Sequence, residues 1–241
     1  MNSLSFLLVD DEKEMLNMLN KDRQTVKKNG LNYVIGTNGK PQRFKPWLGD
    51  CFSFLYDYIM RNSIFPHKFD GDMTKHHQIL LRKLKDVHGK RVIELATGSG
   101  SSINFLDKDN QYTGTDISTG LLKKAVDRFS SAGFKDAEFY VASADDLPFD
   151  DGVFDLCLCI LSLNFFDHTE RVIQEAHRVL TAGSIFLCSV PVPERSKPES
   201  TIRGKLYRED ELASILQKNG FGFEIVPGRN GALLYFSGVK Q

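Results

Sequence analysis

From about residue 89 onward, short apolar segments alternate with longer segments whose apolar residues recur at helical spacing. This alternation, with short connections, is typical of a parallel sheet covered by helices. The final apolar segments, FGFEIV and ALLYFSGV, flank the turn PGRNG and predict an antiparallel hairpin. The predicted strands lie at 92–95, 112–115, 139–142, 154–161 and 185–190, and the predicted helices at 119–129, 172–180 and 212–216.

Outside this alternating region the sequence predicts other structure. Residues 11–29 predict a charged helix, residues 46–87 predict aromatic-rich helical segments, and the polar stretch 191–205 predicts a surface loop. We therefore divide the chain into an N-terminal extension (1–45), a helical lid or cap (46–88) and a core (89–241). The segment FLLVDDEKEM is similar to the opening of a response-regulator receiver. A turn-like stretch stands where a receiver needs its phosphorylated strand, so we assign the segment to the extension.

Charge is balanced across the 241 residues, with 31 Lys and Arg against 31 Asp and Glu. No basic patch and no Asn-Pro-Pro-aromatic stretch is present, which argues against a nucleic-acid substrate. The apolar run Leu4–Val9 is too short to span a membrane and is followed at once by two aspartates. We expect a cytoplasmic protein without stable membrane insertion and with a small-molecule partner.

The cysteines and most histidines predict structural roles, and we expect no metal centre. Three of the four cysteines, Cys157, Cys159 and Cys188, lie in apolar strand-like segments without CxxC spacing, so reduced and buried thiols are expected. The adjacent residues His76 and His77 do not share a helix face, and we expect them to be partly exposed rather than metal ligands. His88 and His177 are also expected to be structural.

The stretch RVIELATGSG predicts a strand that ends in a ligand-binding loop. A Walker-type phosphate loop is excluded because no Gly-Lys pair of the chain is followed by Ser or Thr. A dinucleotide fingerprint needs a third glycine where this chain has Ile103. The loop therefore does not fit a pyrophosphate.

Four residues in and near this loop indicate another ligand. Gly98 and Gly100 allow close approach of the backbone to a ligand, and Asp116, after the second predicted strand, can accept hydrogen bonds from two ribose hydroxyls. Glu94 adds a negative charge that suits an ammonium group. A nucleoside with a positively charged amino-acid tail, S-adenosylmethionine, meets both demands.

Four ordered blocks carry a family resemblance: VIELATGSG, YTGTDIS, ASADDLPFDDGVFDLCLCILSL and EAHRVLTAGSIFLCSV. They resemble the successive motifs of small-molecule class I S-adenosylmethionine-dependent methyltransferases, the group that includes quinone-biosynthesis enzymes. The resemblance implies a Rossmann-like α/β sandwich with a mostly parallel seven-stranded sheet, a C-terminal antiparallel hairpin and an N-terminal helical lid. It also implies methyl transfer to a small molecule, with S-adenosylhomocysteine as product.

The resemblance also implies roles for individual residues. The loop Ala96, Thr97, Gly98 to Gly100 would surround the methionine part, Asp116 would hold the ribose, and Ile117 would pack on the adenine. Ser143, Ala144 and Asp145 would border the adenine edge, and Cys159 to Leu161 would lie beneath the sulfonium.

Two residues depart from the family pattern. The family usually has glycine at the position of Ala96, and alanine is tolerated there if its φ is not positive. The family has an acid at the position of Ser143, so Asp145 or a main-chain carbonyl would have to accept the adenine amino group. Both departures concern cofactor affinity rather than fold.

Residues outside these four blocks are candidates for catalysis. The segment DCFSFLYDYIM resembles the lid helix of quinone-biosynthesis-type methyltransferases, in which Tyr56 would reach the methionine part. Its aromatic side chains could equally pack on the sheet. Methyl transfer is an in-line displacement that depends mainly on positioning and exclusion of water, and a general base is needed only if the acceptor loses a proton. Candidate bases are His67, His76, His77 and His168, of which His168, with nearby Asn164, is best placed, although it could also be a surface residue at a helix start.

The aromatic-rich lid, with Phe165 and Phe166, favours a flat or apolar acceptor. The departures at residues 96 and 143 leave an alternative open. In that alternative, the chain is a methyltransferase-fold protein without catalysis that serves as a binding or regulatory partner.

Overall fold

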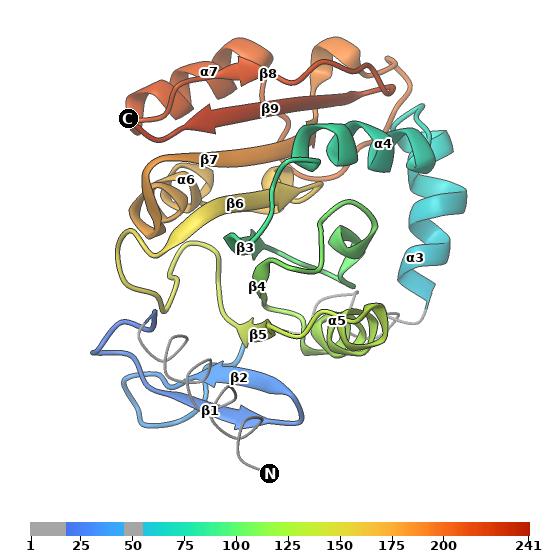
Figure 1. Ribbon diagram of the computed structural model, residues 1–241. Coiled ribbons are helices and arrows are strands. Elements are labelled where there is room, and N and C mark those ends of the chain that lie inside the picture. Colours follow the sequence, from blue (N-terminus) through green and yellow to red (C-terminus); the bar gives the residue numbers. More distant parts are fainter. Residues whose placement is uncertain (1–17, 46–54) are drawn as a thin grey trace.

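The computed structural model describes residues 18–45 and 55–241, and a single nine-stranded sheet runs through it (Figure 1). The strand order is β1-β2-β5-β4-β3-β6-β7-β9-β8. The six strands from β2 to β7 run parallel to one another, whereas β1 at one edge and β9 and β8 at the other pair antiparallel. The strands are β1 (Thr25–Lys28), β2 (Leu31–Val34), β3 (Arg91–Leu95), β4 (Gln111–Asp116), β5 (Ala137–Val141), β6 (Phe154–Ile160), β7 (Leu180–Pro191), β8 (Glu224–Ile225) and β9 (Leu233–Val239).

This architecture confirms the predicted α/β class and the C-terminal antiparallel hairpin, but the predicted number of seven strands is wrong. The two additional strands form an N-terminal hairpin in which β2 pairs parallel with β5, so that Asn32 is opposite Tyr140. The prediction of a helix over 11–29 is also wrong for its described part, residues 18–29. The local reason is the Asn29-Gly30 turn, where both residues have positive φ (52° and 76°), as a tight hairpin turn requires.

Helices cover both faces of the sheet. Residues of α4 (Met73–Leu84) and α5 (Thr119–Ala132) pack in one apolar cluster, and residues of α6 (Thr169–Val179) and α7 (Glu209–Lys218) pack in the other. Helix α5 begins and ends as the sequence predicts. The Ser118 hydroxyl accepts a hydrogen bond from the Leu121 backbone N–H at 3.2 Å, and Gly133 ends the helix with φ of 83°.

The described part of the lid is helical, as predicted. It consists of α3 (Tyr56–Ile59) and a π-helix (Met60–Lys68), which run along the right-hand side of Figure 1 and lead to α4. Residues 46–54, including Trp47, Phe52 and Phe54, lie outside the described residues, as does the receiver-like segment 6–15. The prediction that His76 is partly exposed is wrong. This residue is buried, and its Nδ1 lies 2.9 Å from the Tyr235 hydroxyl.

The loop that follows β7 fastens the C-terminal end of the lid. The Ser200 hydroxyl donates to the Lys68 carbonyl at 2.5 Å, and Lys197 pairs with Asp70 at 2.8 Å. The same loop is bonded to the end of β6, because the Asn164 side-chain amide donates to the Arg203 carbonyl at 2.7 Å. The predicted surface loop therefore connects the lid to the central strands.

The chain order in the sheet reverses at β3, which has β4 on one side and β6 on the other. In such sheets, ligands bind outside the carboxyl ends of the strands at this reversal point. Within the described residues, no helix is both long enough and apolar enough to cross a membrane.

Candidate functional site

A pocket of about 280 Å³ lies at this reversal point. Its walls come from the segments that directly follow β3, β4, β5 and β6, together with the lid and the first turns of α5 and α6. The lining residues are Tyr56, Ala96, Gly98, Asp116, Ile117, Leu121, Ala142, Ser143, Ala144, Asp145, Ile160, Leu161, Ser162, Phe165, Phe166, Asp167, His168 and Val172.

Asp116 holds two segments of this pocket together. One carboxylate oxygen accepts the Gly98 backbone N–H at 2.8 Å, and the other accepts the Ser118 backbone N–H at 2.8 Å. Gly98 has φ of 59°, a conformation that glycine adopts without steric penalty. Gly100 is outside the pocket lining, where a Cβ would lie 3.0 Å from the Ala125 Cβ. The first glycine therefore shapes the pocket, and the second allows the loop to pack on α5.

Two pocket residues other than glycine have positive φ, Ala96 at 52° and Leu161 at 59°. The condition under which alanine fits at residue 96 without strain is therefore not met. A non-glycine residue in this region is strained by about 1–2 kcal/mol. Ala96 follows β3 and Leu161 follows β6, so backbone strain is concentrated at the two strand ends where the sheet order reverses.

Ala96→Gly is expected to stabilise the protein by about 0.5–1 kcal/mol, because removal of the Cβ relieves more strain than the added chain entropy costs. Urea unfolding at equilibrium measures the change. Ala144→Gly is the matched control, since Ala144 lines the same pocket but does not have positive φ. That control should lose about 0.5–1 kcal/mol. A destabilised Ala96→Gly protein would contradict the strain assignment.

Glu94 lies inside the core rather than in the pocket lining. It is 2% exposed, and its Oε2 accepts the Ser102 hydroxyl at 2.7 Å as well as the Tyr112 hydroxyl. Burial raises its pKa to about 7, the two hydroxyl donors act in the opposite direction, and the charge of Asp116 adds to the increase. Near neutral pH this carboxyl is therefore partly protonated, and any effect on a ligand's ammonium group would be indirect.

The lid contributes Tyr56 to the pocket. Burial raises the pKa of Tyr56 to about 12, and the charges of Asp116 and Asp57 add to this effect. The phenol is therefore neutral at physiological pH and can donate a hydrogen bond.

The next residue, Asp57, fastens the lid to the core. Its carboxylate accepts the Ser99 hydroxyl at 2.6 Å, the Arg128 guanidinium at 2.8 Å and the Lys124 ammonium at 3.3 Å. Ser99 belongs to the glycine loop and the two cations belong to α5. The helical segment 55–68 is therefore bonded to the glycine loop and to α5.

The segment expected at the adenine edge also lines the pocket. Ser143 donates its hydroxyl to the Asp145 carboxylate, so the two polar side chains on this wall are already paired. The next residue, Asp146, forms an ion pair with Arg23 from the N-terminal segment. The Asn20 backbone N–H donates to the Pro148 carbonyl at 2.9 Å. The segment before β1 therefore supports this wall from outside.

Several predicted site residues besides Glu94 lie outside the pocket lining: Thr97, Ser99, Gly100, Cys159, Asn164 and the candidate bases His67, His76 and His77. Cys159 is fully buried, with its Sγ 3.4 Å from the Ser162 hydroxyl. Alternate residues of β6 point to opposite faces of the sheet, so the neighbouring Ile160 lines the pocket and Cys159 does not. Asn164 is 2% exposed and binds the loop after β7. His168 is exposed at the N-cap of α6 and lines the pocket edge.

Sequence reasoning missed five pocket residues: Leu121, Ala142, Ser162, Asp167 and Val172. The available signal was position, since Ala142 directly follows a strand, and Leu121 and Val172 lie in the first turns of α5 and α6. Asp167 and His168 also line an open groove of about 830 Å³ that adjoins the pocket and continues to Lys205 and Tyr207.

A mostly parallel sheet with helices on both faces, a glycine loop after β3 and a carboxylate at the end of β4 place this chain among the doubly wound α/β proteins, whose ligands bind at the carboxyl ends of the strands. Residues 93–188 match the family model described as a methyltransferase domain. This matched region, which contains the glycine loop and Asp116, is similar to a methyltransferase domain.

Curated relatives share this region at moderate identity. A fatty-acid O-methyltransferase of Mycolicibacterium smegmatis is 31% identical over 59% of this chain and 51% of its own length. A demethylmenaquinone methyltransferase of Thermotoga maritima is 29% identical over 70% of this chain and 69% of its own length. A phthiotriol/phenolphthiotriol dimycocerosates methyltransferase of Mycobacterium ulcerans is 27% identical over 60% of this chain and 57% of its own length. The chain thus spans about half to two thirds of these relatives.

Solved structures share the fold. An S-adenosylmethionine-dependent methyltransferase of Thermotoga maritima superposes with a TM-score of 0.57 at 18% identity and covers 80% of this chain and 98% of its own. The cyclase SpnF superposes with a TM-score of 0.59 at 19% identity, and the match covers 69% of this chain and 80% of the cyclase. Because one neighbour is a methyltransferase and the other a cyclase, the reaction has to be argued from the site.

Proposed function

We propose that this chain transfers the methyl group of S-adenosylmethionine to an apolar small molecule. The observation that carries the proposal is Asp116, a nearly buried carboxylate held between the glycine loop and α5 in a pocket with an apolar mouth. Vicinal ribose hydroxyls are suitable donors to such a carboxylate. The donor set therefore fits the nucleoside part of this cofactor.

Each wall of the pocket supports a separate part of the proposed function. Asp116 would bind the ribose, Ile117 would pack against the adenine, and Asp145 would border the adenine edge. The bound cofactor supplies a methyl group attached to a positively charged sulfur. Tyr56 and Leu161 would surround this end of the pocket and exclude water, and exclusion of water strengthens the alignment on which an in-line displacement depends.

The mouth of the pocket supports an apolar acceptor. Phe165 is 52% exposed and Ile117 is 40% exposed, although both line the pocket. Large exposed apolar side chains at a cavity entrance mark a surface for an apolar ligand. The names of the three relatives refer to a fatty acid, demethylmenaquinone and phthiotriol dimycocerosates, which are apolar molecules.

An acceptor that is already ionised, such as a carboxylate, needs no general base. For an acceptor that must lose a proton, we propose His168 as the general base, since it lines the pocket edge from the N-cap of α6. Asn164 does not suit this role, because a side-chain amide does not take up a proton near neutral pH. Its side-chain N–H donates to the Arg203 carbonyl and its backbone carbonyl accepts the Lys205 N–H, which makes it part of the loop anchor.

Two measurements test the proposal. Calorimetry with S-adenosylmethionine and S-adenosylhomocysteine should detect binding below millimolar concentration. Incubation with labelled S-adenosylmethionine and a cell extract should then place one added methyl group in the apolar fraction. Phe165→Ala should reduce that transfer without weakening cofactor binding, while Ile225→Ala, at an exposed apolar residue of β8, should change neither.

The strained Ala96 favours a second candidate, a binding or regulatory partner that no longer catalyses. The absence of binding by either cofactor form near millimolar concentration would support this candidate and refute the enzyme. Cofactor binding with transfer confined to the polar fraction would instead contradict only the acceptor class.

A further inference from the structure

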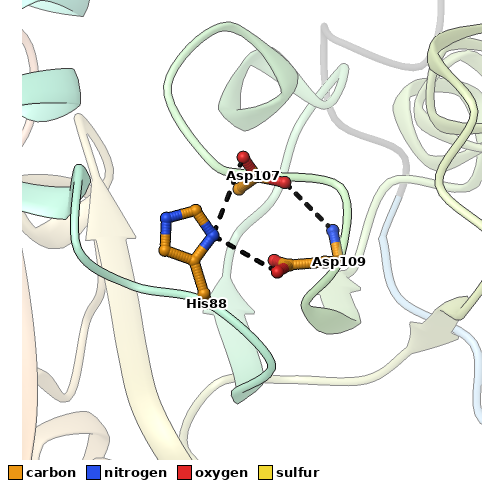
Figure 2. A group of neighbouring side chains, drawn as sticks. All are labelled: His88, Asp107 and Asp109. Atoms are coloured by element: carbon orange, nitrogen blue, oxygen red, sulfur yellow. Dashed lines mark hydrogen bonds and ion pairs between the residues drawn. The ribbon is translucent and has the colours of Figure 1, made fainter.

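Three side chains of types that can bind a metal ion lie at the amino ends of the central strands, opposite the carboxyl ends where the pocket lies. His88 lies in the turn before β3, and Asp107 and Asp109 lie in the turn before β4 (Figure 2). Strands β3 and β4 are neighbours, with Arg91 opposite Gln111, so the two turns lie side by side at the amino ends of the central strands. Methyl transfer as proposed above uses none of these residues.

The three donor atoms have separations suited to a shared ion. His88 Nδ1 lies 3.2 Å from a carboxylate oxygen of Asp109 and 3.8 Å from one of Asp107. One ligand atom of each residue lies within 4.8 Å of the others. An ion about 2.0–2.2 Å from each ligand holds neighbouring ligand atoms roughly 3–3.5 Å apart. The separation between His88 and Asp109 falls within this range, and the separation between His88 and Asp107 exceeds it slightly.

The direction of the His88 ring is set from outside the group. Its Nε2 lies 3.1 Å from the Lys85 carbonyl, which can only accept, so Nε2 carries a hydrogen. In the neutral ring, Nδ1 then presents its lone pair to the two carboxylates. A metal-ligating histidine commonly donates its other N–H to a backbone carbonyl in this way.

The backbone of both turns is held independently of any ion. Asn110 is buried, and its side-chain amide donates to the Val87 carbonyl at 3.0 Å and the Asp107 carbonyl at 2.9 Å. Its Oδ1 accepts the Lys90 backbone N–H at 2.9 Å. One side chain therefore fixes the two turns relative to each other, and preorganisation of this kind lowers the entropic penalty of ligation.

We propose that His88, Asp107 and Asp109 bind one divalent transition-metal ion, which links the turns preceding β3 and β4. One imidazole with two carboxylates suits Zn²⁺, Co²⁺ or Mn²⁺, and water would complete the coordination on the exposed side. The sequence alone predicted a structural His88 and no metal centre, because its two partners lie about twenty residues further along the chain. The role of the ion would be structural, at the edge away from the pocket.

The test uses the full chain after treatment with a chelator. Calorimetric titration with Zn²⁺ and with Co²⁺ should show one ion bound with a Kd below about 100 µM, and saturating Zn²⁺ should raise the melting temperature. His88→Ala and Asp109→Asn should each weaken binding at least tenfold. Asp86→Asn is the matched control, because Asp86 is an exposed carboxylate near the same turn that lies outside the group.

Two results would overturn the proposal. The first is no Zn²⁺ or Co²⁺ binding by the unmodified chain below millimolar concentration, which would leave an ion pair between protonated His88 and the two carboxylates. The second is unchanged affinity in either His88→Ala or Asp109→Asn, which would place the ion elsewhere. Binding of S-adenosylmethionine is measured separately and should be the same with and without the metal.

Discussion

Replacement of Asp116 by alanine is expected to weaken binding of S-adenosylmethionine at least tenfold, which corresponds to about 1.4 kcal/mol. The carboxylate is the proposed acceptor for the ribose hydroxyls, and it also orders the pocket by accepting the Gly98 and Ser118 backbone N–H groups at 2.8 Å. Asp116→Asn keeps one acceptor oxygen and should lose less affinity than Asp116→Ala. Isothermal titration calorimetry measures both changes.

Asp155→Ala is the control for this experiment. Asp155 also accepts a backbone N–H, that of Arg91 at 3.0 Å, but it lies at the amino end of the central strands. The control should therefore bind the cofactor as the unmodified protein does, and circular dichroism shows whether each variant is folded. Unchanged affinity in a folded Asp116→Ala protein would mean that the ribose assignment is wrong.

Glu94→Gln should change how stability depends on pH. The pKa of Glu94 is raised from 4.5 to about 7 in the folded protein, so between these values the folded state holds a proton that the unfolded state has released. The stability that depends on this proton is fully present below pH 4.5 and is lost as pH rises through 7. A difference of roughly 2.5 pKa units corresponds to about 3 kcal/mol.

Glutamine cannot ionise, but its oxygen can still accept the Ser102 and Tyr112 hydroxyls. Between pH 4.5 and pH 8, the stability of Glu94→Gln relative to the unmodified protein should therefore rise by up to about 3 kcal/mol. Urea unfolding at several pH values tests this expectation. Glu138→Gln is the control, because Glu138 accepts the Tyr140 hydroxyl at 2.6 Å but is 22% exposed at its side chain. If the free energy of unfolding changed with pH in the same way for Glu94→Gln and for the unmodified protein, the raised pKa of Glu94 would be contradicted.

Much of the pocket could be predicted from sequence because it is built from strand ends. Apolar segments identify the strands, and the residues that follow them must gather at one edge of a parallel sheet. Gly98, Asp116, Ile117 and the segment 143–145 line the pocket for this reason. Their roles toward a ligand are still proposals.

The N-terminal hairpin shows where pattern reasoning failed. The charged residues of 11–29 favoured a helix, yet Asn29-Gly30 between two short β-prone segments is a local hairpin signal. The pairing of β2 with β5 could not be predicted in the same way, because it joins residues more than a hundred positions apart and depends on an open sheet edge.

From residue 89 onward, the sequence by itself determined the order of strands and helices, the helix caps at Ser118 and Gly133, and the ends of the strands that carry the pocket. These features follow from local periodicity and local hydrogen bonds. Only the tertiary structure decided the positive φ of Ala96, the inward direction of Glu94 and the bonds between Asp57 and α5. Each of these depends on how distant segments meet, because close packing fixes a backbone angle or a side-chain direction that the local sequence leaves open.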